Sequence, residues 1–179
     1  LAALRSGTDL ADEAALARIA GQLDVVFKGT KIFMGNQEVT DDIRAEDCGN
    51  GASRIAAYAP VRAALMARQR AFRQPPGLVA DGRDMGSVVF PDARLKIFLT
   101  ASAAERAQRR YKQLMEKGIG ANISTLLQDI QERDARDSSR SVAPLQQGAE
   151  ASLLDTTSLN IAQAVDEVVK QYTASEQGV

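Results

Sequence analysis

The sequence LVADGRDMG, residues 78–86, indicates both the fold and the place where a ligand would bind. Its first three residues are a short apolar run, which we predict to be a buried core strand. In α/β proteins ligands bind beyond the carboxyl ends of the strands, which is where residues 81–86 would lie. The glycines permit a sharp turn, and Arg83 can grip a phosphate through two parallel hydrogen bonds. The stretch therefore predicts an anion-binding turn; the alternative is a plain Asp-Gly turn whose arginine and aspartate pair with each other.

Strand-like and helical patterns alternate along the rest of the second half of the chain. We expect two further core strands at residues 95–99 and 152–154, and helices at about 103–117, 123–137 and 158–172, the last with Ser158 as its N-cap. Strands that alternate with helices indicate a parallel sheet covered on both faces. The sequence thus predicts an α/β fold.

The first half of the chain has a different pattern. Helices are expected at residues 12–23, 46–57 and 60–72, and three short strand-like pieces broken by glycines lie between residues 25 and 40. These pieces predict a small antiparallel sheet of their own, inserted as a separate lobe.

The composition excludes several classes of function. Lys and Arg number 22 against 23 Asp and Glu, so no overall basic field attracts a nucleic acid polymer. The sequence contains no run of 18 apolar residues, so it predicts no membrane-spanning helix. The chain has no histidine, which removes histidine-based catalysis and metal sites, and we assign no residue as a metal ligand. The single cysteine, Cys48, fits a reducing compartment, and we expect the protein in the cytoplasm.

Arginines gather in two segments besides Arg83. One segment, residues 106–110, carries three arginines on about one and a half helical turns, and the other is residues 132–140. Each segment alone is more often a solvated helix face with local ion pairs. Sites that transfer phosphoryl groups need several fixed positive charges around the moving phosphate, so the three together favour that chemistry.

Three stretches resemble the bacterial cytidylate kinase family: DGRDMGSVVFPDA at residues 81–93, ERDARDSSRSVAPL at 132–145 and ASRIAA at 52–57. The resemblance covers essentially the whole chain in order. It implies a P-loop kinase-type parallel sheet with a small antiparallel insertion that binds the nucleoside monophosphate (NMP) and a helical lid. On this basis residues 1–23 are a helical remainder of the core, 24–75 the NMP-binding domain, and 76–179 the core with a lid at about 103–140.

The resemblance also implies an activity. The family transfers a phosphoryl group from ATP, with Mg²⁺, to CMP or dCMP in pyrimidine nucleotide metabolism. The implied partners are these small molecules, without nucleic acid or membrane, and we expect a monomer. An enzyme that also uses UMP is the nearest alternative.

Each candidate site residue matches a family position. Ser53, Arg62 and Asp84 would surround the cytosine ring; Arg83 and Arg140 would hold the substrate phosphate; Arg133 and Asp137 would reach the sugar; and Arg106, Arg109 and Arg110 would close over the ATP phosphates. Arg83, Arg140 and Arg109 are the expected catalytic residues. Cytosine has a 4-amino donor that a carboxylate accepts, whereas uracil has an oxygen there, so Asp84 would favour CMP over UMP.

One family motif is absent. The phosphate-binding loop, Gly-x-x-x-x-Gly-Lys-[Ser/Thr], does not occur, and the 179 residues contain no Gly-Lys pair. Residues 1–4 begin without methionine and are typical of the middle or end of a helix. We therefore expect a segment before Leu1 that carries this loop and the central strand of the sheet. A chain without it is expected to lack kinase activity, which leaves a CMP-binding fragment as a second alternative.

Overall fold

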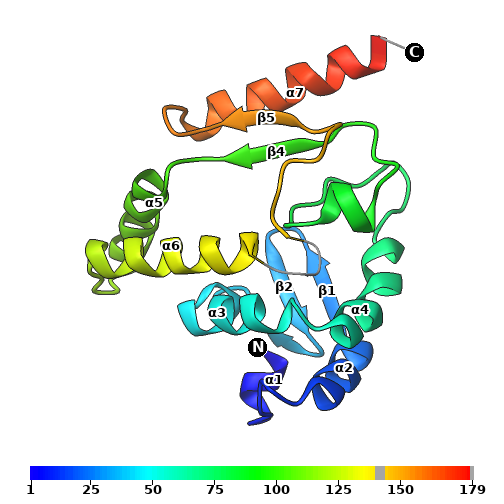
Figure 1. Ribbon diagram of the computed structural model, residues 1–179, viewed down its shortest axis with the longest axis vertical. Helices are drawn as coiled ribbons and strands as arrows, with labels where there is room; N and C mark the ends of the chain where they lie inside the picture. The colour runs from blue at the N-terminus through cyan, green and yellow to red at the C-terminus, as the bar shows by residue number, and fades with distance from the viewer. Residues whose placement is uncertain (140–143, 178–179) are drawn as a thin grey trace. The chain divides into compact units, whose positions relative to one another are not determined.

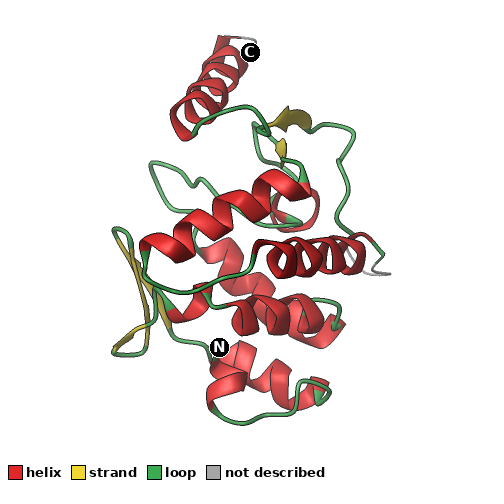
Figure 2. Ribbon diagram, turned by 90° about the vertical axis from the view of Figure 1, so that its left-hand side faces the viewer, coloured by secondary structure: helices red, strands yellow, loops and turns green. Residues whose placement is uncertain are grey.

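The structure is a computed structural model that describes residues 1–139 and 144–177. The chain forms two compact units, one made of residues 1–80 and the other beginning at Asp81. Helices make up most of the described chain, and the strands form two small sheets (Figure 2). The assignment of three functional domains stays a prediction.

The first unit is built mainly from helices. They are α1 (Ala2–Arg5), α2 (Glu13–Gln22), a 3₁₀ turn at Asp42–Arg44, α3 (Glu46–Ile55) and α4 (Ala59–Ala71). The Asp12 carboxylate caps α2 by accepting a 2.9 Å hydrogen bond from the Ala15 N–H. Apolar side chains of α1, α2 and α4 meet in one core around Ala3, Leu16, Ala20 and Val61. The helices expected at 12–23, 46–57 and 60–72 are confirmed.

An antiparallel sheet completes the first unit. Its strands are β1 (Val25–Lys28), β2 (Lys31–Met34) and β3 (Gln37–Glu38), in that spatial order. Gly29 and Gly35 lie in the connecting turns at φ 59°, a left-handed conformation that glycine adopts without strain. The predicted small sheet between residues 25 and 40 is therefore confirmed.

The second unit contains a parallel sheet flanked by helices. Its elements are a π-helical turn η2 (Met85–Val89), β4 (Ile97–Thr100), α5 (Ala103–Glu116), α6 (Ile123–Ser138), β5 (Ser152–Asp155) and α7 (Ile161–Gln177). β4 and β5 pair in parallel from Ile97–Ser152 to Thr100–Asp155. α7 runs beside β5 (Figure 1), and the Ser152 hydroxyl donates a 2.7 Å hydrogen bond to Gln171 Oε1. These observations confirm the mixed α/β class.

Two expectations for the second half were wrong. Residues 78–80 form no strand, because they pair with neither sheet in the described chain, and the Val79 side chain is 98% exposed. Ser158 does not cap the last helix. Asn160 does so, because the Gln163 N–H donates to Asn160 Oδ1 and the Asn160 N–H donates to Gln163 Oε1, both at 2.9 Å.

No helix in residues 1–139 and 144–177 has the length and hydrophobicity needed to cross a membrane.

Candidate functional site

The turn that carries Arg83 and Asp84 leads directly into η2. The Asp84 carbonyl accepts hydrogen bonds from the Val88 and Val89 N–H groups at 2.9 and 3.2 Å, so the backbone at Asp84 is fixed. A Cβ on Gly82 would lie 2.9 Å from Met85 Cγ, so the close approach requires glycine or movement of Met85. Short π-helical turns are rare and frequently occur at functional sites. The turn predicted from residues 81–86 is therefore present, although no strand precedes it.

Arg83 is joined to the end of α6 by a buried carboxylate. Its Nε–H donates to Asp137 Oδ2 at 2.7 Å, and Arg133 Nε lies 3.9 Å from the same oxygen. The Asp137 side chain is 1% exposed, whereas those of Arg83 and Arg133 are 41% and 37% exposed. Two arginines thus share one buried anion, which compensates for the burial of its charge. Three of the predicted site residues are brought together here.

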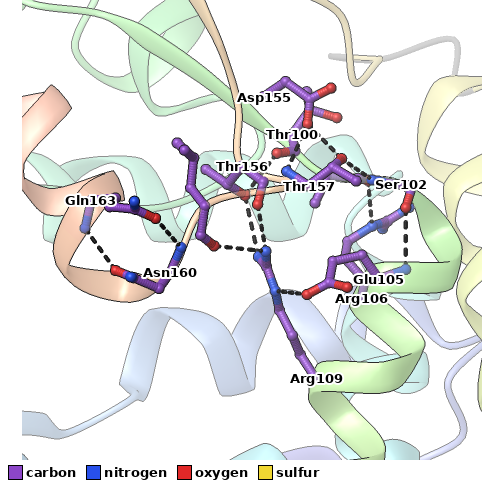
Figure 3. A network of polar contacts seen from close by, with 12 residues as sticks. Thr100, Ser102, Glu105, Arg106, Arg109, Asp155, Thr156, Thr157, Asn160 and Gln163 are labelled. Atoms are coloured by element: carbon purple, nitrogen blue, oxygen red, sulfur yellow. Dashed lines mark hydrogen bonds and ion pairs between the residues drawn. The ribbon is translucent and has the colours of Figure 1, made fainter.

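The arginines of α5 have other partners. Arg109 donates through Nε to Glu105 at 2.8 Å, through Nη1 to the Thr156 hydroxyl at 3.2 Å, and through Nη2 to the Thr156 and Leu159 carbonyls (Figure 3). The Thr156 hydroxyl in turn donates to the Thr100 carbonyl at 2.9 Å. Arg109 therefore ties α5 to the loop that follows β5.

Arg106 forms a two-pronged ion pair with Asp134 of α6. Its Nη1 lies 2.9 Å from Asp134 Oδ1, its Nη2 donates to Oδ2, and its Nε–H donates to the Ala101 carbonyl at 3.1 Å. The hydrogen bonds to Asp134 raise the pKa of Arg106. Arg110, the third predicted lid residue, lies in the same helix and is half-buried. In this structure Arg106 and Arg109 thus stabilise the contacts of α5 with α6 and with the loop after β5.

Two of the three predicted cytosine-binding residues lie in the first unit. Ser53 is 5% exposed and lies in the last turn of α3. Arg62 lies in the first turns of α4 and donates through Nη1 to the Ala56 carbonyl, just past the end of α3, at 3.4 Å. The helix pair therefore brings Arg62 to the end of the helix that carries Ser53. Asp84, the third, is half-buried in the second unit, and Arg140 lies outside the described residues.

The carboxyl ends of β4 and β5 carry a polar cluster that the sequence reasoning missed. Asp155 Oδ1 accepts hydrogen bonds from the Thr157 hydroxyl at 2.6 Å and the Thr157 N–H at 2.8 Å (Figure 3). The hydroxyl bond is the main cause that lowers the pKa of Asp155 below its usual value. The Thr157 hydroxyl also accepts from the Ser102 N–H at 2.9 Å. Polar residues directly after the strand at 152–154 were a signal for this cluster, by the same strand-end rule that drew attention to Arg83.

Within the described ranges no group of three acidic or cysteine side chains lies close enough to hold a metal ion.

Comparison with known proteins agrees with the residue pattern. The family model described as cytidylate kinase matches residues 1–174. The chain is 56% identical over 177 residues to a cytidylate kinase of Burkholderia vietnamiensis, an alignment that covers 99% of this chain and 78% of that protein. It is 58% identical over 174 residues to a cytidylate kinase of Bordetella pertussis, covering 97% and 78% respectively. A cytidylate kinase of Nitrosomonas europaea is 54% identical over 177 residues, covering 99% and 79%. The chain therefore belongs to the cytidylate kinase family.

Proposed function

We propose that this protein transfers a phosphoryl group from ATP to CMP or dCMP and that its Arg83 turn holds the acceptor nucleotide. The observation that carries the proposal is Arg83 in the turn before η2, paired with buried Asp137, in a chain that matches the family over residues 1–174. Phosphoryl transfer asks for little covalent work from the protein, so positioning and charge stabilisation are the tasks of its residues.

The base is recognised by complementary hydrogen bonds. The Asp84 carboxylate accepts from the 4-amino group of cytosine, and Arg62 donates to the ring acceptors, with Ser53 beside it. The half-buried position of Asp84 supports this assignment. In UMP the 4-oxygen of uracil would face the carboxylate with no hydrogen between the two oxygens, and in a partly desolvated site this contact is unfavourable. CMP is thereby preferred over UMP.

The phosphate and sugar meet arginines. Arg83 and Arg140 hold the acceptor phosphate, and Arg133, which is 37% exposed in its side chain, faces the sugar. ATP enters as its Mg²⁺ complex, the metal being part of the substrate. Arg106, Arg109 and Arg110 contact its phosphates when the lid closes, which requires Arg109 to leave the Thr156 and Leu159 carbonyls. The 179 residues contain no Gly-Lys pair, so the ATP side of the proposal rests on the family alone.

We also propose the cellular compartment and the oligomeric state of the protein. The only cysteine, Cys48, is buried in α3, which supports a reducing compartment such as the cytoplasm. We propose a monomer, and gel filtration with light scattering would show a mass near 19.2 kDa for these residues.

Calorimetry and a coupled phosphoryl-transfer assay test the function with CMP, dCMP, UMP and AMP as acceptors. CMP and dCMP are expected to bind and react best. Asp84→Ala is expected to weaken CMP binding by about 1–3 kcal/mol, the effect of an unmet buried polar contact, and to strengthen UMP binding, because the carboxylate that faces the uracil 4-oxygen is removed.

Three results are informative against parts of the proposal. Equal turnover of CMP and UMP by the parent would contradict the role of Asp84. Binding of CMP without binding of ATP would indicate a CMP-binding fragment in place of an enzyme. A chain that binds none of the four nucleotides would refute the proposal as a whole.

A further inference from the structure

We infer that Glu105 is a positioning residue: it holds the Arg109 guanidinium so that its two terminal nitrogens can take the phosphates of ATP. The inference deepens the proposed function and rests on it, since it concerns the ATP side of the same reaction. Glu105 lies four residues before Arg109 on α5, so the two side chains are neighbours on one face of the helix.

The Glu105 carboxylate is available to Arg109 because another side chain occupies its usual partner. Ser102 is the N-cap of α5, and its hydroxyl accepts a 3.2 Å hydrogen bond from the Glu105 N–H. In a capping box the carboxylate of a glutamate at this position accepts in return from the N-cap N–H. Here the Ser102 N–H donates to the Thr157 hydroxyl at 2.9 Å, and the Glu105 carboxylate accepts from Arg109 Nε–H at 2.8 Å (Figure 3). The loop after β5 thus leaves Glu105 to bond Arg109.

The hydrogen bonds of Arg109 divide into one that persists and three that can be exchanged. Glu105 lies on the same helix as Arg109, so their bond is kept when α5 moves. The terminal nitrogens donate to neutral oxygens, those of the Thr156 hydroxyl and of the Thr156 and Leu159 carbonyls. A phosphate oxygen is a stronger acceptor for a guanidinium than a neutral oxygen is. ATP can therefore replace the contacts of the terminal nitrogens without disturbing the bond from Nε.

Arg106 has the opposite arrangement. Its two terminal nitrogens bond the Asp134 carboxylate, and its Nε–H bonds the Ala101 carbonyl. A phosphate would have to displace a carboxylate there, so the exchange gains less than at Arg109. Of these two arginines, Arg109 is therefore the one whose terminal nitrogens are ready for an anion.

The charge of Glu105 gives the inference a definite sign. A Glu105 that served only as a counter-ion would repel a bound triphosphate and weaken ATP binding. A Glu105 that fixes the guanidinium reduces the side-chain ordering that binding requires, and so strengthens ATP binding. The Arg109 and Glu105 side chains are 37% and 35% exposed, so water screens the repulsion. Glu105→Gln keeps the size of the side chain and removes its charge, and the direction of its effect distinguishes the two roles.

Calorimetry with ATP and with CMP tests the inference. ATP with Mg²⁺, and separately CMP, are titrated into the parent, Glu105→Gln and the control Glu116→Gln, which removes the same charge from the exposed end of α5. Glu105→Gln is expected to bind ATP about fivefold more weakly, the scale of ordering one long side chain, and to bind CMP like the parent. The control is expected to bind both like the parent. Unchanged or tighter ATP binding by Glu105→Gln would overturn the inference, and so would an equal loss for ATP and CMP, which would show a general loosening of the fold.

Failure of the proposed function gives a different result in the same experiment. A parent that binds CMP but not ATP would refute the ATP side of that function, and the inference with it. A parent that binds neither nucleotide would refute both sides.

Two further measurements cover a variant that fails to fold. In the Arg109→Met background, Glu105→Gln is expected to add almost no further loss of ATP affinity, because no guanidinium remains to be held; an unchanged loss would show that Glu105 acts independently of Arg109. In the unaltered protein, the ¹⁵N–¹H signal of Arg109 Nε is expected to exchange slowly with water before and after saturation with ATP. Loss of this signal on ATP binding would show that Arg109 leaves Glu105, and would overturn the inference without any variant.

Discussion

Two pairs of arginines in the second unit are held in opposite ways. Arg83 and Arg133 share a carboxylate that is 1% exposed, whereas Arg106 pairs with an Asp134 side chain that is 34% exposed. Arg109 likewise donates to a Glu105 side chain that is 35% exposed, and to backbone carbonyls. The same residue type therefore surrounds a buried anion in one place and joins partly hydrated elements in the other.

Burial decides how strongly one partner of an ion pair depends on the other. A buried carboxylate cannot recover its hydration, so it needs its arginine more than the half-exposed arginine needs it. At Arg106 both partners reach water, so neither is left stranded when the other is removed. The buried cluster should therefore respond strongly to loss of an arginine, and the α5 contacts weakly.

The largest expected effect is that of Arg83→Met on stability. The change removes the 2.7 Å hydrogen bond that Arg83 donates to the buried Asp137 carboxylate, from which Arg133 Nε lies 3.9 Å away. We expect a loss of about 3 kcal/mol, the low end for breaking a buried ion pair, because Arg133 remains. The free energy of unfolding from urea denaturation measures it.

Arg106→Met is the matched control for this change. It removes an arginine of similar exposure whose carboxylate partner reaches solvent, and we expect a loss of about 1 kcal/mol or less. Equal losses of unfolding free energy in the two variants would contradict this expectation, because burial of the carboxylate partner would then have no effect on stability.

Local patterns in the sequence were enough to predict most elements. Helices such as α2 and α4 can be predicted from their apolar periodicity and from Asp12 or Pro60 at their start. These signals are properties of a few adjacent residues. The strand expected at residues 78–80 failed because a strand exists only through its hydrogen-bonded neighbours. An apolar run does not reveal whether such a neighbour is present.

The candidate site shows the same limit. The turn at Arg83 could be predicted from its glycines, and local ion pairs were the alternative weighed for the other arginines. That alternative describes Arg109 with Glu105, four residues away on one helix. The bond between Arg83 and Asp137 joins residues 54 positions apart, so nothing in either sequence neighbourhood could reveal it.

A smaller effect is expected from Arg109→Met. The variant loses the hydrogen bonds to the Thr156 and Leu159 carbonyls, and with the side chain 37% exposed water replaces part of them. We expect a loss of about 1–2 kcal/mol, together with faster amide exchange at Thr156, whose N–H donates to the Thr100 carbonyl. Hydrogen exchange followed by NMR measures both.

Arg94→Met serves as its control, because the pair with Glu176 is about half exposed on both sides and should contribute under about 0.5 kcal/mol. If Arg109→Met were as mild as this control, Arg109 would not tie α5 to the β5 loop, and the α5 side of the comparison would lose its structural meaning.

The smallest effect concerns an exposed carboxylate bonded to a neutral group. Thr157→Val removes the hydroxyl that is the main cause of the lowered Asp155 pKa, so this pKa is expected to rise toward its usual value. A carboxyl with a depressed folded-state pKa stabilises the fold above its unfolded pKa, and that contribution disappears as the pH falls through the folded pKa. The stabilities of parent and variant should therefore differ most near neutral pH and converge in acid.

An NMR titration of the side-chain carboxyl carbons measures the Asp155 pKa in both proteins. Glu150 is the internal control, because its pKa is lowered by Lys96 and should not change with the substitution. An Asp155 pKa unchanged by the substitution would show that its backbone bond to the residue 157 N–H is sufficient, and that an exposed carboxylate here needs no side-chain partner at all.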